Sequence, residues 1–200
     1  MRILQPQRRK SKVSVIEHIE KNFGKISKGW SFSEDAHPYQ IVECRDGSVE
    51  GVVSFCTLGL SNVGLKSAVS PQIIFHELLL SVDQHEVPKN AVAIVKQFAD
   101  DALASNYALL NNQLVQREGV VFENHLFSAV WVKPPVFFGD ESFSHEGVGR
   151  DDVSCIFAWL VPIFDSELSY IKDNGADAFE ALLENSSVDV FSLSRKSVVD

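Results

Sequence analysis

The stretch from Ser154 to Phe164 constrains the fold more than any other part of the chain. Every residue in it after Ser154 is apolar (CIFAWLVPIF). A strand with one face in water alternates apolar and polar residues, whereas a strand covered on both faces is apolar almost throughout. The run therefore predicts a central, buried strand of a sheet.

Four other apolar runs also predict strands, at Tyr39–Arg45, Val49–Leu58, Gln72–Val82 and Leu126–Lys133. The Asp46-Gly47 pair between the first two is the favoured chemistry of a tight hairpin turn. Residues 25–38, 59–71 and 136–152 are expected to be loops, and residues 107–125 give no clear pattern. Ser187–Leu193 can form a short edge strand.

Helical periodicity marks four segments. Apolar residues three and four apart predict a helix from Val13 to Phe23 that ends at Gly24, and a second over about 88–106 with Pro88 in its first turn. Asp165 or Ser166 can cap a third helix that Gly175 closes, and a fourth carries Phe179, Leu182 and Leu183. The order of elements predicts a single α+β domain over residues 13–200, with a mixed or largely antiparallel sheet and helices packed on it.

Charge is distributed unevenly along the chain. Residues 1–12 hold five basic residues and no acidic one, and we expect them to form a disordered tail. The remaining residues hold 13 basic and 27 acidic side chains, a net charge of −14 against −9 for the whole chain. Such a body repels nucleic acid, whose binding depends on phosphate contacts. It attracts a basic protein, which is the partner we expect.

Compartment follows from the cysteines and from the apolar runs. Cys44, Cys56 and Cys155 lie in apolar segments, as is typical of buried free thiols in a reducing cytoplasm. No run approaches the ~18 apolar residues that cross a bilayer. The basic start lacks the apolar segment of a secretory signal. We therefore expect a cytoplasmic protein without membrane contact.

The segment GLSNVGLKS, Gly59–Ser67, resembles two catalytic motifs without matching either. A phosphate-binding loop needs Lys directly after its second Gly, but Leu65 intervenes before Lys66. A nucleophile elbow needs a second Gly where Val63 stands. Nucleotide binding and a Ser61 nucleophile are therefore not expected.

Metal and cofactor motifs also fail. A zinc-protease helix that began at His76-Glu77 would need a second His where Leu80 stands, and the six histidines show no ligand spacing. His76 is interpreted as a hydrogen-bonded core or edge residue. We predict no metal, no cofactor and no enzymatic activity; if the chain were an enzyme, Ser61, Cys56 and His76 would be the first candidates.

The 136–152 loop is the candidate partner-binding site. It lacks the alternating oxygen ligands and central Gly of an EF-hand, so it is either a solvated loop or a contact surface for a basic partner. Its acidic residues, opposed by Arg150 alone, are Asp140, Glu141, Glu146, Asp151 and Asp152.

Among the tryptophans, Trp131 and Trp159 are expected in the core, whereas Trp30 is either an exposed interface anchor or buried over a sheet edge.

An ordered series of segments over roughly residues 35–197 resembles the suppressor-of-fused domain family. The segments are His76–Leu78, Phe122-Glu123 with Leu126–Pro134, Phe157–Ile163, Glu167-Leu168, Gly175–Asp177, Phe179, and Asp189 through Ser197. The family includes an animal regulator of Hedgehog signalling, which binds a transcription factor, and short bacterial members that resemble immunity proteins or antitoxins of polymorphic toxin systems. The resemblance implies a non-enzymatic binding protein with an α+β fold.

Two function hypotheses follow from this resemblance. The first is a bacterial immunity protein that neutralises a cognate toxin, for example a nuclease, using acidic surface as a nucleic-acid mimic. The second is a general regulator that holds a transcription factor or an enzyme inactive. Binding by strand addition at a sheet edge, as the animal relative does, is a further possible mode. Asp189, Arg195 and Lys196 lie in the family-like C-terminal segment and serve either in contact or in pairing within the fold.

Overall fold

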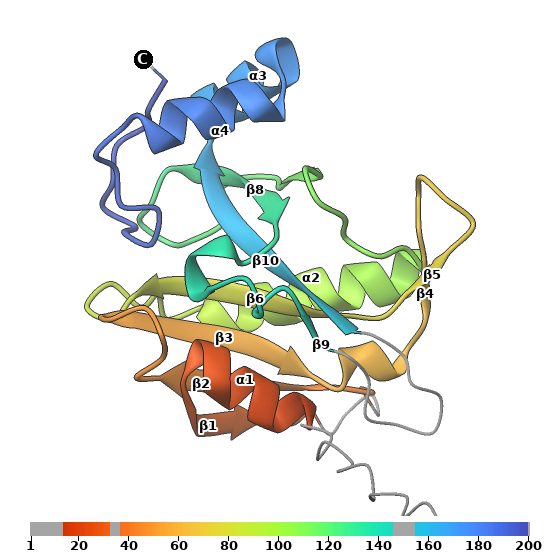
Figure 1. Ribbon diagram of the computed structural model, residues 1–200. Coiled ribbons are helices and arrows are strands. Elements are labelled where there is room, and N and C mark those ends of the chain that lie inside the picture. Colours follow the sequence, from red (N-terminus) through yellow and green to blue (C-terminus); the bar gives the residue numbers. More distant parts are fainter. Residues whose placement is uncertain (1–13, 33–36, 146–154, 200) are drawn as a thin grey trace, which may run out of the picture.

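The computed structural model describes residues 14–32, 37–145 and 155–199, which form one α+β domain (Figure 1). The helices are α1 (Val15–Phe23), α2 (Ala91–Ser105), α3 (Asp165–Asn174) and α4 (Ala176–Glu184), with short 3₁₀ helices η1 (Leu60–Asn62) and η2 (Val136–Phe138). The strands are β1 (Lys25–Trp30), β2 (Gln40–Arg45), β3 (Val52–Leu58), β4 (Leu65–Lys66), β5 (Ile73–Ile74), β6 (His76–Asp83), β7 (Leu114–Gln116), β8 (Phe127–Lys133), β9 (Ser144–His145) and β10 (Cys155–Phe164).

The main sheet is mixed but mostly antiparallel. Its order is β1-β2-β3-β6-β10-β8-β7, and β9 also pairs with β10. All neighbouring strands are antiparallel except β6 and β10, which are parallel. Strands β4 and β5 form a separate two-stranded sheet. The predicted fold class is therefore confirmed.

The central strand is β10, as its apolar run predicts. It pairs with β6 from Ile156 to Trp159 and with β8 from Trp159 to Phe164. Alternate side chains enter two separate hydrophobic clusters, for example Trp159 in one and Leu160 in the other. Pro162, which cannot donate a ladder hydrogen bond, lies beyond the part that pairs with β6, so β6 loses no bond to it.

Helices cover both faces of the sheet (Figure 1). The apolar face of α2, including Val95 and Phe98, packs in one cluster with the inner strands. Helices α1, α3 and α4 lie on the opposite face, where Phe23, Ile171 and Phe179 join the second cluster. This coverage explains why β10 is apolar on both sides.

Helix α1 and the β2–β3 hairpin pack closely together at Gly24 and Gly47. Ser14 caps α1 through a reciprocal pair of hydrogen bonds with Glu17, and the helix ends at Gly24, as predicted, with a φ of 108°. A Cβ on Gly24 would lie 2.2 Å from the carbonyl oxygen of Arg45. The hairpin is confirmed, but its connection runs over residues 46–51 and is longer than the tight turn that Asp46-Gly47 predicts.

Several predicted boundaries are wrong. Lys25–Trp30, expected within a loop, forms the edge strand β1, because pairing with β2 overrides its weak local pattern. Ser187–Leu193, a candidate edge strand, contains no strand. The predicted strand Gln72–Val82 is split at Phe75 into β5 and β6, and the unassigned residues 107–125 contain β7.

Candidate functional site

The structure describes two of the five predicted contact residues. Asp140 and Glu141 are exposed between η2 and β9. The carboxylate of Glu141 pairs with the ammonium of Lys21 on α1, which lowers the pKa of Glu141. Exposed pairs of this kind contribute little to stability. Glu146, Asp151 and Asp152 lie outside the described residues.

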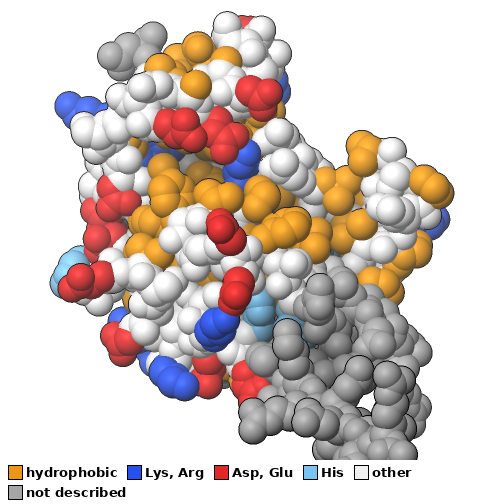
Figure 2. All heavy atoms as spheres, in the orientation of Figure 1, with side chains coloured by type: hydrophobic (Ala, Val, Ile, Leu, Met, Phe, Trp, Pro, Cys, Tyr) orange, Lys and Arg blue, Asp and Glu red, His pale blue; other side chains and the backbone are white. Residues whose placement is uncertain are grey.

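A larger feature is a cavity of about 430 Å³ between the sheet, η2, α4 and the chain after α4, which we call the C-terminal groove. Hydrophobic side chains form a band across this face of the molecule, with acidic side chains along its border (Figure 2). The lining residues are Trp131 and Lys133 of β8, Val136 and Phe137 of η2, Trp159 and Val161 of β10, Glu180, Leu183 and Glu184 of α4, and Ser186, Val188, Asp189, Val190 and Phe191.

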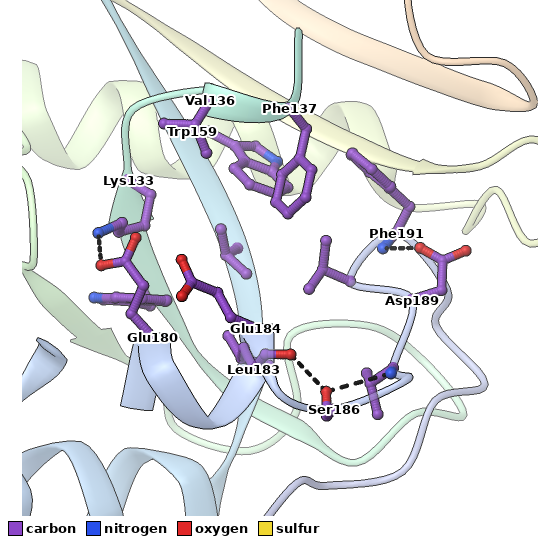
Figure 3. A pocket seen from close by; sticks show the side chains of 14 residues that line it. Lys133, Val136, Phe137, Trp159, Glu180, Leu183, Glu184, Ser186, Asp189 and Phe191 are labelled. Carbon is purple, nitrogen blue, oxygen red and sulfur yellow. Dashed lines mark hydrogen bonds and ion pairs between the residues drawn. The ribbon is translucent and has the colours of Figure 1, made fainter. Parts of the chain in front are cut away.

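Prolines at the end of β8 create one wall of the groove. Pro134-Pro135 cannot continue the strand ladder, and the chain turns into η2 directly afterwards. Within η2 only Phe138 points into the core, while Val136 and Phe137 are each 57% exposed. Val136, Phe137 and Trp159 lie on one side of the cavity, and Glu180, Leu183 and Glu184 of α4 lie on the other (Figure 3).

Aromatic rings form the floor. The rings of Trp159 and Phe191 lie 5.5 Å apart, and Phe137 meets both edge-on at 5.7 and 5.8 Å. Trp131 packs edge-on against Phe179 of α4 at 5.3 Å. Neither buried indole N–H has a hydrogen-bond partner among the described residues. Because both indole nitrogens are buried, the floor presents aromatic carbon to the cavity.

The rim of the groove carries more acid than base. The ammonium of Lys133 donates to Glu180 at 2.8 Å and lies 4.6 Å from the centre of the Trp131 ring. Glu184 and Asp189 are exposed. One oxygen of Asp189 accepts the backbone N–H of Phe191, which leaves its other oxygen available. Since one ammonium faces three carboxylates, the rim is negative.

Sequence reasoning placed Trp131 and Trp159 in the core, which is confirmed, but missed the groove above them. The signal was present in Val136 and Phe137, two apolar residues directly after a proline pair.

Trp30 is partly buried and packs over the sheet, with its ring 6.3 Å from that of Phe55. This position favours burial over interface anchoring for Trp30.

The segment that resembles a phosphate loop binds a carboxylate of its own chain. Glu77 on β6 is fully buried and accepts from the backbone N–H groups of Gly59, Leu60 and Ser61 at 2.9, 3.2 and 3.1 Å. The hydroxyls of Ser61 and Thr57 donate to it at 2.6 and 2.5 Å. Burial raises the pKa of Glu77, and these donors oppose the rise. The backbone N–H groups of this loop that could bind a phosphate are therefore already paired with Glu77.

The other candidate reactive groups are also buried. His76 is fully buried, accepts the N–H of Leu109 at 3.4 Å, and has its pKa lowered to about 4 by burial. The three cysteines are free and buried, as predicted, and burial raises the pKa of Cys44 and Cys155 to about 12. Across residues 14–32, 37–145 and 155–199, no three His, Cys, Asp or Glu side chains converge as a metal would require. Over the same ranges no helix is long and apolar enough to span a bilayer.

Comparison with protein families matches residues 35–196 to the family described as Suppressor of fused protein (SUFU). The chain belongs to the suppressor of fused family. The resemblance drawn from the sequence is thereby confirmed.

Individual relatives of this SUFU-family chain are distant. It is 24% identical over 183 residues to the immunity protein YqcF of Bacillus subtilis, covering 88% of each chain. A solved SUFU homologue from Neisseria gonorrhoeae superposes with a TM-score of 0.69 at 16% identity, covering 92% of this chain and 93% of that one. A chain of the Sufu–Fu complex gives a TM-score of 0.66 at 14% identity, covering 92% and 90%. These structures establish a shared fold.

The family-like C-terminal segment is anchored within the SUFU domain by a buried ion pair. Arg195 makes two hydrogen bonds to Glu167 of α3, at 2.6 and 2.7 Å, and donates to the carbonyl of Pro162 at 3.0 Å. Glu167 also accepts the N–H groups of Phe164 and Val198. Glu167 thus caps the start of α3 from within the helix, whereas the predicted caps, Asp165 and Ser166, are wrong because they are the first two residues of α3. Of the three C-terminal candidates, Arg195 has a structural role, while Lys196 is exposed.

Proposed function

We propose that this SUFU-family chain is an immunity protein that binds a cognate toxin and neutralises it without catalysing a reaction. The observation that carries the proposal is the relationship to YqcF, which extends over 88% of both chains. Immunity proteins act by occupying another protein, so a stable surface is what such a function requires.

The buried state of the reactive groups supports a non-enzymatic role. Ser61 donates to a carboxylate rather than to a histidine, and Cys56 is buried with its pKa raised well above its usual value. A general base within reach of substrate and with a suitable pKa is the usual need of acid–base and nucleophilic catalysis. Free, buried thiols also support a reducing compartment, and we propose the cytoplasm.

We propose that the partner is basic and that the acidic loop contributes to its capture. Residues 13–200 carry a net charge of −14, and a toxin that acts on nucleic acid needs a basic surface. Complementary charge raises the association rate and fixes orientation. The proposed contacts remain Asp140, Glu141, Glu146, Asp151 and Asp152.

The acidic loop is tested by replacing these five residues with their amides. We expect weaker binding to the toxin and a flatter dependence of affinity on salt, because fewer charges are screened. Isothermal titration calorimetry at low and high salt measures both quantities. A five-residue variant with the affinity and salt slope of the parent protein would remove the loop from the interface.

The immunity function itself is tested by co-expression. The gene next to the one for this chain is cloned with an inducible promoter, and its product is expressed with and without the chain. We expect growth arrest without the chain, rescue with it, and a complex that survives gel filtration. A toxic product that the chain neither binds nor counteracts would exclude this toxin and contradict the proposal.

The second candidate is a regulator that holds a transcription factor or an enzyme inactive. It is favoured by the similarity to a chain whose structure was solved as the Sufu–Fu complex. Such a partner would be encoded elsewhere and would be harmless when expressed alone. Purification of a tagged copy from the native cell, followed by mass spectrometry, separates the two functions.

A further inference from the structure

We infer that the C-terminal groove is the docking site for a segment of the partner protein in which a large apolar side chain lies beside Arg or Lys. The inference rests on the proposed function and adds to it the surface used and the chemistry recognised. It differs from the acidic-loop proposal because it involves the face between η2 and α4.

The walls and floor of the C-terminal groove are apolar and suit a large apolar side chain of the partner. Val136 and Phe137 stand side by side at 57% exposure over aromatic rings. A volume of about 430 Å³ is within the range of about 300–1,000 Å³ typical of ligand pockets. Apolar pockets receive the anchor side chains that dominate protein interfaces. A flat polar surface of a partner would leave this concave, aromatic-lined cavity unfilled.

The rim of the groove is acidic and suits an Arg or Lys of the partner. Lys133 already neutralises Glu180, so Glu184 and Asp189 supply the excess negative charge. The Glu184 carboxylate lies on the α4 side of the cavity, opposite η2 (Figure 3). An arginine is the best complement, since its guanidinium pairs with carboxylates and also stacks on aromatic rings.

The groove is held in place before any partner arrives. Its floor lies on the paired strands β8 and β10. Its far wall is fixed by Glu86, which accepts the N–H of Leu193 at 2.5 Å and the hydroxyl of Ser192 at 2.9 Å. The carbonyl of Phe191 also accepts the N–H of Asp83 at 2.9 Å. A preformed site loses less conformational entropy on binding, which favours affinity.

The experiment compares two groove variants with two matched controls. Phe137→Ser removes an exposed apolar side chain of the groove, and Leu126→Ser removes one elsewhere that is 77% exposed. Glu184→Lys reverses an exposed rim charge, and Glu118→Lys reverses an exposed charge elsewhere. Thermal unfolding checks that each variant is folded; Glu184→Lys changes only an exposed charge and keeps the test valid if Phe137→Ser does not fold.

Binding to the neighbouring toxin and protection of growth are then measured. We expect each groove variant to bind about tenfold or more weakly, as hot-spot changes do, and each control within about twofold of the parent. Parent protein that protects cells, together with groove variants of unchanged affinity, overturns this inference and leaves the immunity function intact. Parent protein that does not protect overturns the immunity function instead.

A second arm tests the groove without the toxin. A phage-displayed library of random twelve-residue peptides is selected on the parent protein. We expect enriched peptides with an aromatic residue or Leu next to Arg or Lys, whose binding falls in the Phe137→Ser and Glu184→Lys variants. Peptides that bind all variants equally, or no enrichment, overturn the inference. A concentration-dependent dimer that Phe137→Ser abolishes would assign the groove to a second copy and overturn it too.

Discussion

Single side chains in this protein form hydrogen bonds and ion pairs with charged groups that folding buries. The pair of Arg195 and Glu167 is the best example, because their side chains are 3% and 0% exposed. Arg195→Ala leaves the Glu167 carboxylate buried without its cation. We expect the free energy of unfolding to fall by about 3–5 kcal/mol, as for other broken buried pairs. Urea denaturation followed by tryptophan fluorescence measures the loss.

The control for this prediction is the next residue. Lys196→Ala removes an exposed cation and should change the free energy of unfolding by no more than about 0.5 kcal/mol. Adding Glu167→Gln to Arg195→Ala should recover part of the loss, because the unpaired charge is gone. A single Arg195→Ala variant as stable as the parent would show that the pair is unimportant.

A second residue-scale prediction concerns acid. Burial lowers the pKa of His76 to about 4, against 6.5 when exposed. Below pH 6.5 the unfolded chain therefore binds a proton that the folded chain excludes, so stability falls as pH falls, by about 3 kcal/mol near pH 4. His76→Gln, which can still accept from Leu109, should reduce this loss in urea titrations at pH 7 and pH 4.5.

The matched control is His85→Gln, at an exposed position two residues beyond β6. It should keep the acid sensitivity of the parent. Burial also lowers the pKa of His18 and His145, so some loss on acidification should remain in every variant. An unchanged pH slope in His76→Gln would mean that the pKa of His76 is the same in the folded protein as in the unfolded chain.

At the scale of elements, the chain after α4 depends on side chains and not on a backbone ladder. Glu86 accepts from the N–H groups of Leu193 and Ser194 and from the hydroxyls of Ser192 and Ser194. Glu86→Ala should destabilise the protein by about 1–3 kcal/mol. Hydrogen exchange should rise over residues 190–195 while α2 stays protected, and Glu118→Ala should change neither. Equal exchange in variant and parent would show that other contacts hold this segment.

The same element shows where sequence reasoning fails. Ser187–Leu193 can form a short edge strand by its sequence, but Glu86, more than a hundred residues away, accepts the backbone N–H of Leu193, which a strand would pair. The edge strand β1 was missed for the opposite reason, since Lys25, Lys28 and Gly29 have low strand propensity and pairing with β2 decides the outcome. Helix α2 could be predicted because its apolar residues recur on one face, and strand β10 because it is apolar on both faces.

At the scale of the molecule, the order of the strands in the sheet determines which residues form the candidate site. The C-terminal groove joins β8, η2, β10, α4 and the segment up to Phe191, which only the sheet order brings together. Composition favours a basic partner, and the acidic loop was proposed from its own residues; both stay predictions. No local pattern, however, predicts that the walls of a groove will face each other across the sheet.

Net charge gives the last prediction, because it acts over the whole surface. Residues 1–12 hold five bases, so their deletion changes the net charge from −9 to −14. A basic partner should then associate faster at low salt, and the difference should vanish near 0.5 M salt, where charges are screened over a few ångströms. Stopped-flow fluorescence measures the rates. Replacing the five bases with Gln in the full-length chain should give the same gain, since charge and not length is the cause. Slower association after either change would instead show that these bases contact the partner directly.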